Sequence, residues 1–285
     1  QGEFVNFLNV YRTMRPKIPF GIGQIGKAFR NEITPGNFTF RTIEFEQMEH
    51  QFFCKEGTDS DYYNYYKKFA HDFFVDLGLN DQKLRFKDHE KLAHYAKEAC
   101  DVEYLFPMGW GEIYGNHNRT DYDLKRHQEF SGKSMEYLDP ETNEKYIPYV
   151  IESSCGADRL TLAILCDAYH EEELEDKTTR EIMKFHPAIA PYKLAVLPLI
   201  KKYHQEKAME IYKQLSKNFM VNYDESGNIG KRYRRQDIMG TPFVLTVDDE
   251  TLNNNTVTIR NRDTMEQITL PLDEVKDYIE EKIQF

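Results

Sequence analysis

Two stretches of alternating side chains, joined by a short turn, constrain the fold of this chain more than any other feature. Residues 22–32 and 38–53 alternate in character, and residues 33–37 between them contain Pro35 and Gly36. Side chains along a strand point to opposite faces with a period of two, so both stretches are typical of strands. They predict a β-hairpin with two long arms.

One face of this hairpin carries an unusual set of side chains, and two interpretations of it are open. Cross-strand ion pairing on a solvated sheet would explain any single pair of charges. An aromatic ring among the charges instead favours a purine nucleotide, with the ring for stacking, an arginine for phosphate and a carboxylate for an exocyclic amine. The face presents Arg30 and Glu32 on the first arm, then Arg41, Ile43, Phe45, Gln47 and Glu49 on the return arm.

A second segment, residues 149–160, reads as a strand, a Ser/Gly turn and the start of an apolar helix. Arg159 falls in the first helical turn, where the helix dipole favours anions rather than cations. A bound polyphosphate would remove this conflict, because a helix N-terminus with an arginine forms an anion site. The alternative is an arginine that simply reaches solvent.

The order of the elements predicts two domains. Residues 1–185 are rich in strands and loops, whereas the chain from residue 186 on alternates between apolar strands and amphipathic helices, which indicates a small α/β domain with a mixed sheet over residues 186–285. Within the first domain we expect a helix over residues 61–79, with Tyr62, Tyr66, Phe69 and Phe73 packing inward.

Two further motifs have competing interpretations. Residues 21–26 (GIGQIG) match the dinucleotide-binding fingerprint, but a poor strand precedes them and a turn follows, so we expect an extended segment that another backbone approaches closely. Residues 231–235 (KRYRR) hold the densest cluster of cations. Such a cluster around a tyrosine suits RNA, although a solvated helix face is the common alternative.

Composition limits the class of protein without deciding it. The net charge is −11, which argues weakly against nucleic-acid binding, but charges are screened beyond about 8 Å, so a local basic cluster still decides phosphate contact. The four cysteines are scattered and indicate neither a zinc site nor a disulfide framework, which favours a reducing, cytoplasmic location. No stretch is long and apolar enough to predict a membrane span.

Residues 29–32 (FRNE) with residues 41–45 (RTIEF) resemble motif 2 of the class II aminoacyl-tRNA synthetases, and residues 156–159 (GADR) resemble motif 3. Residues 44–49 (EFEQME), 106–113 (FPMGWGEI) and 223–227 (YDESG) are similar to the glycyl-specific members of that family. The resemblance covers essentially the whole chain. It implies an α/β (α+β) protein, with an antiparallel-sheet catalytic core followed by a small mixed-sheet anticodon-binding domain.

The resemblance also implies roles for individual residues. Arg30 would hold the ATP α-phosphate and Arg159 the γ-phosphate, and these two would be catalytic. His117 and His127 are expected to be structural, since this chemistry needs no general base. ATP would contact Arg30, Asn31, Glu32, Phe40, Arg41, Phe45, Glu112, Ile113, Gly156, Asp158 and Arg159; glycine would contact Phe45, Gln47, Glu49, Glu152, Ser154 and Gly156; tRNA would contact Lys231, Arg232, Arg234 and Arg235; Glu112 would hold a metal ion.

The implied activity is ATP-dependent ligation of glycine to tRNA(Gly) through glycyl-adenylate, with ATP and Mg²⁺ required and a homodimer expected. The chain begins without an initiator Met, and motif 1 is expected upstream of Gln1, so this stretch alone is expected to be inactive or to dimerise poorly. Three alternatives are open: an inactive synthetase-like accessory protein that binds nucleic acid, a synthetase for another amino acid, and a nicotinamide-dependent oxidoreductase.

Overall fold

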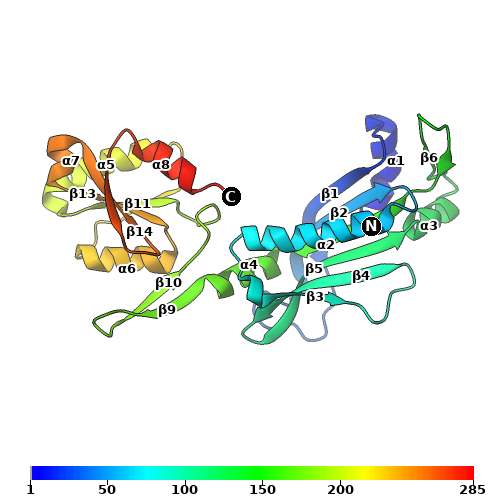
Figure 1. The fold of residues 1–285 in the computed structure, drawn as a ribbon, viewed down its shortest axis with the longest axis horizontal. Coiled ribbons are helices and arrows are strands. Elements are labelled where there is room, and N and C mark those ends of the chain that lie inside the picture. Colours follow the sequence, from blue (N-terminus) through cyan, green and yellow to red (C-terminus); the bar gives the residue numbers. More distant parts are fainter. Residues whose placement is uncertain (1) are drawn as a thin grey trace. The chain divides into compact units, whose positions relative to one another are not determined.

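The computed structural model describes residues 2–285, which divide into two compact units (Figure 1). The first unit comprises residues up to Val75 together with Leu79–Ala163, and the second comprises Asp76–Gly78 and Ile164–Phe285. The structure thus groups residues 164–185 with the second unit, ahead of the expected boundary at residue 186. One cause is the buried Arg180, whose guanidinium Nε lies 3.0 Å from the Asp237 carboxylate.

The first unit is built on a six-stranded antiparallel sheet in the order β1-β2-β8-β5-β4-β3. This arrangement confirms the antiparallel core that the resemblance implied. Its strands are β1 (Phe20–Phe29), β2 (Glu44–Cys54), β3 (Leu84–Asp88), β4 (Glu98–Phe106), β5 (Gly109–Thr120) and β8 (Tyr149–Gly156); its helices are α1 (Gly2–Met14), α2 (Asp59–Asp76), α3 (Tyr122–Ser131) and α4 (Ala157–Ala168), and the small elements are η1 (Asp81–Lys83), β6 (Tyr137–Leu138) and β7 (Lys145–Tyr146).

The predicted hairpin exists, but its return arm is shorter than predicted. β1 and β2 pair antiparallel from Phe20 opposite Phe53 to Phe29 opposite Glu44. Residues 30–43 form the connection, because Asn37 and Phe38 have φ of 55° and 54°, which an extended strand cannot adopt. The face expected to run from Arg41 to Glu49 is therefore a strand face only from Phe45 onward, and Arg30, Glu32 and Arg41 lie on a loop.

The two faces of the first sheet are covered differently, because alternate residues of β2 and β8 point to opposite sides. Phe53 and Val150 pack under α1 and α3 with Phe4, Phe7 and Leu124. Their neighbours Cys54 and Ile151 point to the other side and pack against Tyr63 of α2. The side that carries Phe53 continues along the same strands as a row of polar residues, and we call it the polar face.

The prediction of which side of helix α2 is buried was only partly correct. Tyr62 and Tyr66 pack against the sheet as expected. Phe69 and Phe73 are instead 51% and 43% exposed, and their rings stack on each other. The apolar side chains of this helix that are buried are Tyr63, Ala70 and Phe74. Aromatic residues occupy both sides of α2, so spacing alone did not identify the buried side.

The glycine-rich segment lies within β1, which pairs antiparallel with β2 at the edge of the sheet and is followed by a loop rather than a helix. This is not the strand–turn–helix context of a dinucleotide site. The close approach expected at these glycines occurs at Gly21, where a Cβ would lie 2.1 Å from Nε2 of His50. The approaching group is therefore a side chain and not a backbone.

The second unit confirms the predicted mixed sheet, in the order β12-β11-β13-β14-β15. β11 is parallel to β12 and β13, whereas β13, β14 and β15 pair antiparallel. Apolar residues of α5 and α8 pack on one face of the sheet, and Ile229 and Tyr233 of α6 pack on the other. Its elements are β9 (Tyr169–Glu173), β10 (Thr179–Met183), β11 (Leu194–Pro198), α5 (Lys201–Leu215), β12 (Val221–Tyr223), α6 (Ile229–Met239), β13 (Phe243–Val247), α7 (Asp249–Asn254), β14 (Thr256–Asn261), β15 (Gln267–Pro271) and α8 (Val275–Lys282).

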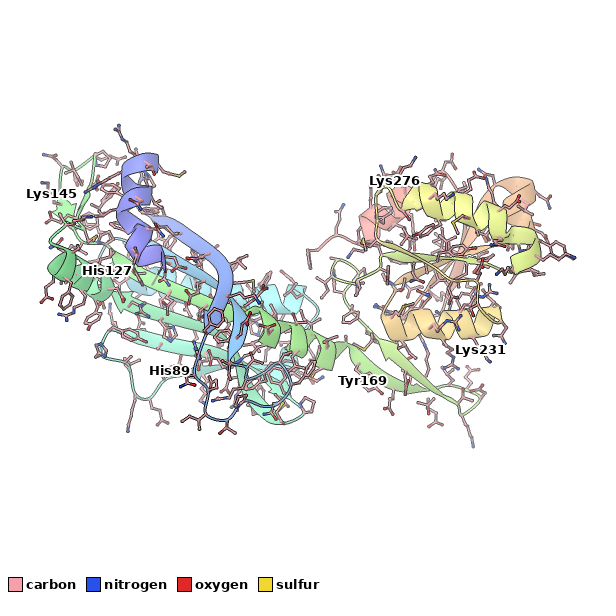
Figure 2. All side chains as sticks on the ribbon, turned by 180° about the vertical axis from the view of Figure 1, so that it is seen from behind. His89, His127, Lys145, Tyr169, Lys231 and Lys276 are labelled. Carbon is pink, nitrogen blue, oxygen red and sulfur yellow. The ribbon has the colours of Figure 1, made fainter. Side chains whose placement is uncertain are left out.

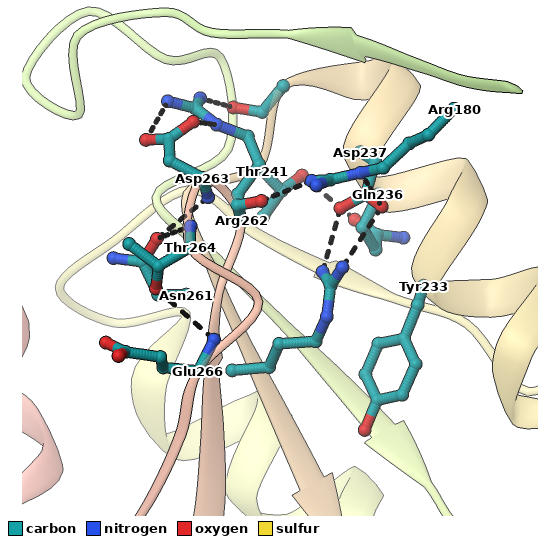
Figure 3. Close-up of polar contacts among 12 residues, drawn as sticks. Arg180, Tyr233, Gln236, Asp237, Thr241, Asn261, Arg262, Asp263, Thr264 and Glu266 are labelled. Atoms are coloured by element: carbon teal, nitrogen blue, oxygen red, sulfur yellow. Dashed lines mark hydrogen bonds and ion pairs between the residues drawn. The ribbon is translucent and has the colours of Figure 1, made fainter. Parts of the chain in front are cut away.

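A network of buried arginines ties the β9–β10 hairpin and the β14–β15 turn to helix α6 (Figure 3). The Asp237 carboxylate accepts hydrogen bonds from Arg180 at 3.0 Å and from Arg260 at 2.8 Å. Arg262 donates to the carbonyls of Gly240 and Phe185 at 2.8 and 2.7 Å. A buried guanidinium is tolerated only when its charge and donors are satisfied, and these are.

Candidate active site

A single cavity in the first unit collects side chains from both motifs. Arg30 is the first loop residue after β1, Phe45 lies at the start of β2, and Arg159 lies in the first turn of α4. Residues more than a hundred positions apart thus face one space. The cavity is lined by Arg30, Glu32, Thr39, Phe40, Arg41, Thr42, Phe45, Gln47, Glu112, Ile113, Ser154, Gly156, Asp158 and Arg159.

The β1–β2 loop forms one side of this cavity. The carbon at the centre of the Arg30 guanidinium lies 5.3 Å from the centre of the Phe45 ring. Glu32 faces Arg41 with 3.3 Å between carboxylate and guanidinium. The first interpretation expected such an ion pair across two strands, but this one lies within the β1–β2 loop, on a cavity wall beside the half-buried Phe45 ring. An ion pair is therefore present, although not across strands, and the nucleotide interpretation stays a prediction.

Arg159 is held in the cavity and does not extend into solvent. Its Nε donates to the Phe40 carbonyl at 2.8 Å, and Nη1 donates to the Glu112 carbonyl at 3.1 Å. The guanidinium also lies 4.5 Å from the centre of the Phe40 ring, and its side chain is only 21% exposed. These contacts fix a guanidinium at the N-terminus of a helix, where an anion is favoured.

The neighbouring Asp158 connects the helix to the loop. Its carboxylate accepts the Glu46 backbone N–H at 2.8 Å, and its carbonyl accepts the Thr39 hydroxyl at 3.3 Å. The loop that carries Arg30 and the helix that carries Arg159 are therefore bonded to one another on the two sides of the cavity.

The carboxylates expected to hold an ammonium group lie beside the cavity on the polar face. Glu49 on β2 is opposite Ser154 on β8, and Gln51 is opposite Glu152. Burial, followed by the nearby carboxylates of Glu3 and Glu152, raises the pKa of Glu49 above its usual range. A cation placed between these carboxylates would relieve their mutual repulsion.

Arg119 on β5 fixes the position of Glu152. Its Nη1 donates to both Glu152 oxygens at 3.1 Å, while its Nε donates to Asp123 at 2.7 Å. Gly115 on β5 is paired opposite Ser154 on β8, and a Cβ at this position would lie 3.0 Å from His117 Cε1. A glycine here keeps the floor of the polar face open.

The structure thus brings together most of the predicted nucleotide and amino-acid residues and adds some that were not predicted. Asn31 is exposed on the loop, and Ile113 is almost fully buried under the cavity. Thr39 and Thr42 line the cavity although neither was singled out, because their loop was predicted to be strand.

The predicted tRNA-contacting cluster divides on helix α6. Lys231 is exposed (Figure 2), and Arg234 is half-buried, donating to the Thr179 carbonyl at 3.3 Å. Arg235 pairs with Asp224 at 2.6 Å but remains 42% exposed. Arg232, in contrast, is 3% exposed and donates to the carbonyls of Pro198 and Gly227. Its predicted role as an RNA ligand is corrected, because the side chain is buried and both Nη atoms already donate to carbonyls inside the unit.

Comparison with known families agrees with this geometry. Residues 4–169 match the tRNA synthetase class II core domain (G, H, P, S and T), and residues 193–282 match the anticodon binding domain. The chain belongs to the class II aminoacyl-tRNA synthetase family, as motifs 2 and 3 predicted.

Several of the curated proteins to which the chain is similar are glycine--tRNA ligases. The chain is 61% identical along its whole length to glycine--tRNA ligases of Clostridium kluyveri and Geobacillus kaustophilus, and 56% identical to that of Bacillus cereus. The chain spans about three fifths of the length of these relatives, namely 62%. Across residues 2–285, the structure contains no helix of the length and apolar character that a membrane span requires.

Proposed function

We propose that this chain is the motif 2, motif 3 and anticodon-binding part of a glycine--tRNA ligase that joins glycine to tRNA(Gly) through glycyl-adenylate. The observation that carries the proposal is the convergence of Arg30, Phe45 and Arg159 on one cavity. The names of the similar proteins support glycine as the amino acid.

In the proposed first step, a glycine carboxylate oxygen attacks the α-phosphorus of ATP in line, and pyrophosphate leaves. Arg30 would neutralise charge on the α-phosphate, and Arg159 would hold the γ-phosphate of a bent triphosphate. Phe45 would stack on adenine, and the Glu32 carboxylate would accept a hydrogen bond from the adenine amino group. Catalysis would come from positioning and from charge neutralisation rather than covalent chemistry.

In the proposed second step, a hydroxyl of the terminal tRNA ribose attacks the glycyl carbonyl, and AMP leaves. Glu49 and Glu152 would hold the glycine ammonium, with Ser154 closing the pocket on the side of Gly115. Glycine has no side chain to grip, so selectivity would come from walls that leave no room for a methyl group.

ATP-dependent transfer of this kind uses Mg²⁺, and Glu112 suits the ion. Its carboxylate is 48% exposed beside the cavity and lies 3.3 Å from Arg159. Mg²⁺ is usually held by one or two carboxylates together with substrate phosphates, and a single accessible carboxylate fits that pattern. The bound ion would neutralise phosphate charge.

Lys231, Arg234 and Arg235 would contact tRNA phosphates. The working enzyme would be a homodimer.

Pyrophosphate exchange by the protein at its full natural length, run with each amino acid, tests the proposal. We expect exchange with glycine alone. Exchange with a different amino acid would replace glycine as the substrate. Absence of exchange, together with no thermal stabilisation by ATP or a non-hydrolysable glycyl-adenylate analogue, would favour the inactive accessory protein.

A further inference from the structure

Beside the proposed active site, the strand register lines up three potential metal ligands. Ala99 on β4 is opposite His117 on β5. On the other side of β4, the His89 backbone N–H donates to the Ala99 carbonyl at 3.0 Å and extends the β3–β4 pairing by one residue. Residues directly opposite each other share a face, and so do residues two apart along a strand. His89, His117 and Asp101 therefore lie on one face, around the small side chain of Ala99.

Their side chains meet there. His89 Nε2 lies 2.9 Å from Asp101 Oδ2, and the rings of His89 and His117 have centres 5.8 Å apart at 82° (His89 is labelled in Figure 2). One donor atom from each of the three residues falls within 4.8 Å of the others. That separation is close enough for a metal bonded to each at about 2.0–2.2 Å, after small side-chain adjustments.

A second observation indicates that this cluster lacks a ligand. His117 Nδ1 is buried and has no hydrogen-bond partner among residues 2–285. Glu152 Oε1 lies 3.5 Å from this atom, which is longer than a hydrogen bond of this type. Buried imidazole nitrogens are normally satisfied, so an unsatisfied one beside a histidine–carboxylate pair needs an explanation.

We propose that His89, Asp101 and His117 bind a divalent transition-metal ion, with zinc as the first candidate. Two imidazoles and one carboxylate are a zinc donor set, and three protein ligands leave a fourth position for water. Imidazole ligands disfavour Mg²⁺ and Ca²⁺, which prefer oxygen. The site is therefore distinct from the Mg²⁺ proposed at Glu112. It does not depend on the proposed function, because neither ATP nor tRNA enters the argument.

The chain offers a matched control for the test. His71 Nε2 lies 2.9 Å from Asp81 Oδ1, so this pair reproduces the histidine–carboxylate contact of the cluster. It does not belong to the three-ligand group found among the described residues. A metal that needs three ligands will distinguish the two places, whereas a metal that binds surface histidines will not.

The experiment is equilibrium dialysis of the chelator-treated chain against Zn²⁺, with metal content measured by mass spectrometry, and Co²⁺ absorption as the probe of geometry. We expect one zinc per chain, retained in excess Mg²⁺ and in His71→Gln. His89→Gln and Asp101→Asn should each weaken binding by about 100-fold or more, since even outer-shell changes cost 10- to 100-fold. Co²⁺ should give visible bands without the near-ultraviolet absorption of thiolate ligands.

Circular dichroism of each variant separates lost ligands from lost folding, and His89→Gln is the most tolerant, because the His89 side chain is 32% exposed. Zinc binding that survives both His89→Gln and Asp101→Asn in folded protein would overturn the proposal. So would a loss of binding in His71→Gln equal to that in His89→Gln, or a Co²⁺ spectrum dominated by thiolate absorption.

Discussion

The two units use arginine in opposite ways. In the first unit, Arg30 and Arg159 line a cavity, and Arg159 is held there by two carbonyl oxygens and by the Glu112 carboxylate at 3.3 Å. In the second, Arg180 is buried with its charge paired to Asp237, and Arg232 is buried with both Nη atoms bonded to carbonyls. An arginine that lines a cavity is accessible to a phosphate, whereas an arginine buried among protein acceptors stabilises the fold. Position relative to solvent distinguishes the two roles, and local density of positive charge does not.

The two sheets also differ, in which of their faces helices cover. The second sheet has helices packed on both faces, so the residues proposed to contact tRNA lie outside it, on α6. The first sheet has α2 over one face, while the polar face carries Glu49, Glu152 and Ser154 between its covered end and the cavity. Replacing a cavity arginine should therefore change activity in the first unit, and replacing a buried arginine should change stability in the second.

The largest effect is expected for Arg159→Ala. Loss of one charge-stabilising donor typically costs about 10²–10³ in rate, so glycine-dependent pyrophosphate exchange by the protein at its full natural length should fall by that factor. The melting temperature should barely change. Arg126→Ala removes an exposed arginine paired only at the surface, and should leave both unchanged. Equal rates for the two variants would show that Arg159 does not act on ATP.

Arg232→Met should act on stability instead. It removes a buried guanidinium that bonds two carbonyls, and leaving buried polar groups unsatisfied costs about 1–3 kcal/mol. Urea unfolding of the chain should show a less stable second unit, with nucleotide binding by the first unit unchanged. If Arg232→Met keeps its stability but binds tRNA more weakly, Arg232 contacts RNA after all.

Lys231→Ala should give a smaller effect, confined to tRNA binding. Removing one phosphate contact should weaken the complex modestly and reduce the slope of log affinity against log salt by about 1. Lys276 is the control, because it is 47% exposed on another helix of the same unit (Figure 2). If Lys276→Ala lowers the salt slope as much as Lys231→Ala, the basic cluster on α6 has no special role.

The smallest effect concerns pH. The pKa of Glu49 is raised, so this carboxyl stays protonated to a higher pH than an ordinary glutamate and becomes an anion only as the pH rises through that raised pKa. Glycine ammonium should therefore bind more tightly as the pH increases across that range, and KM for glycine should fall. In Glu49→Gln this dependence should disappear. The same raised pKa means that ionised Glu49 destabilises the fold at neutral pH, so Glu49→Gln should unfold no more easily there.

The sequence predicted the architecture better than it predicted surfaces. Motif residues identified the family and most of the cavity, because their chemistry is specific. The buried side of α2 was not predictable, since aromatic residues lie on both sides of the helix. The extent of the β1–β2 loop was not predictable either, since the stretch predicted as the return strand includes Phe38, which has a positive φ. The burial of Arg232 depends on contacts with Pro198 and Gly227, which no local pattern reveals.

The cluster around Ala99 shows the same limit. His89, Asp101 and His117 have no recognisable spacing, and they meet only because the register of β3, β4 and β5 aligns them. Register is set by long-range pairing, which a single sequence does not specify by itself.

The bond between Asp158 and the backbone of residue 46 has an evolutionary consequence. Its donor is a main-chain amide, which every amino acid except proline supplies, so drift at position 46 leaves the bond intact. Its acceptor is a side-chain oxygen, which few residue types can replace. Position 46 should therefore tolerate many substitutions and position 158 few, although the two positions share one hydrogen bond.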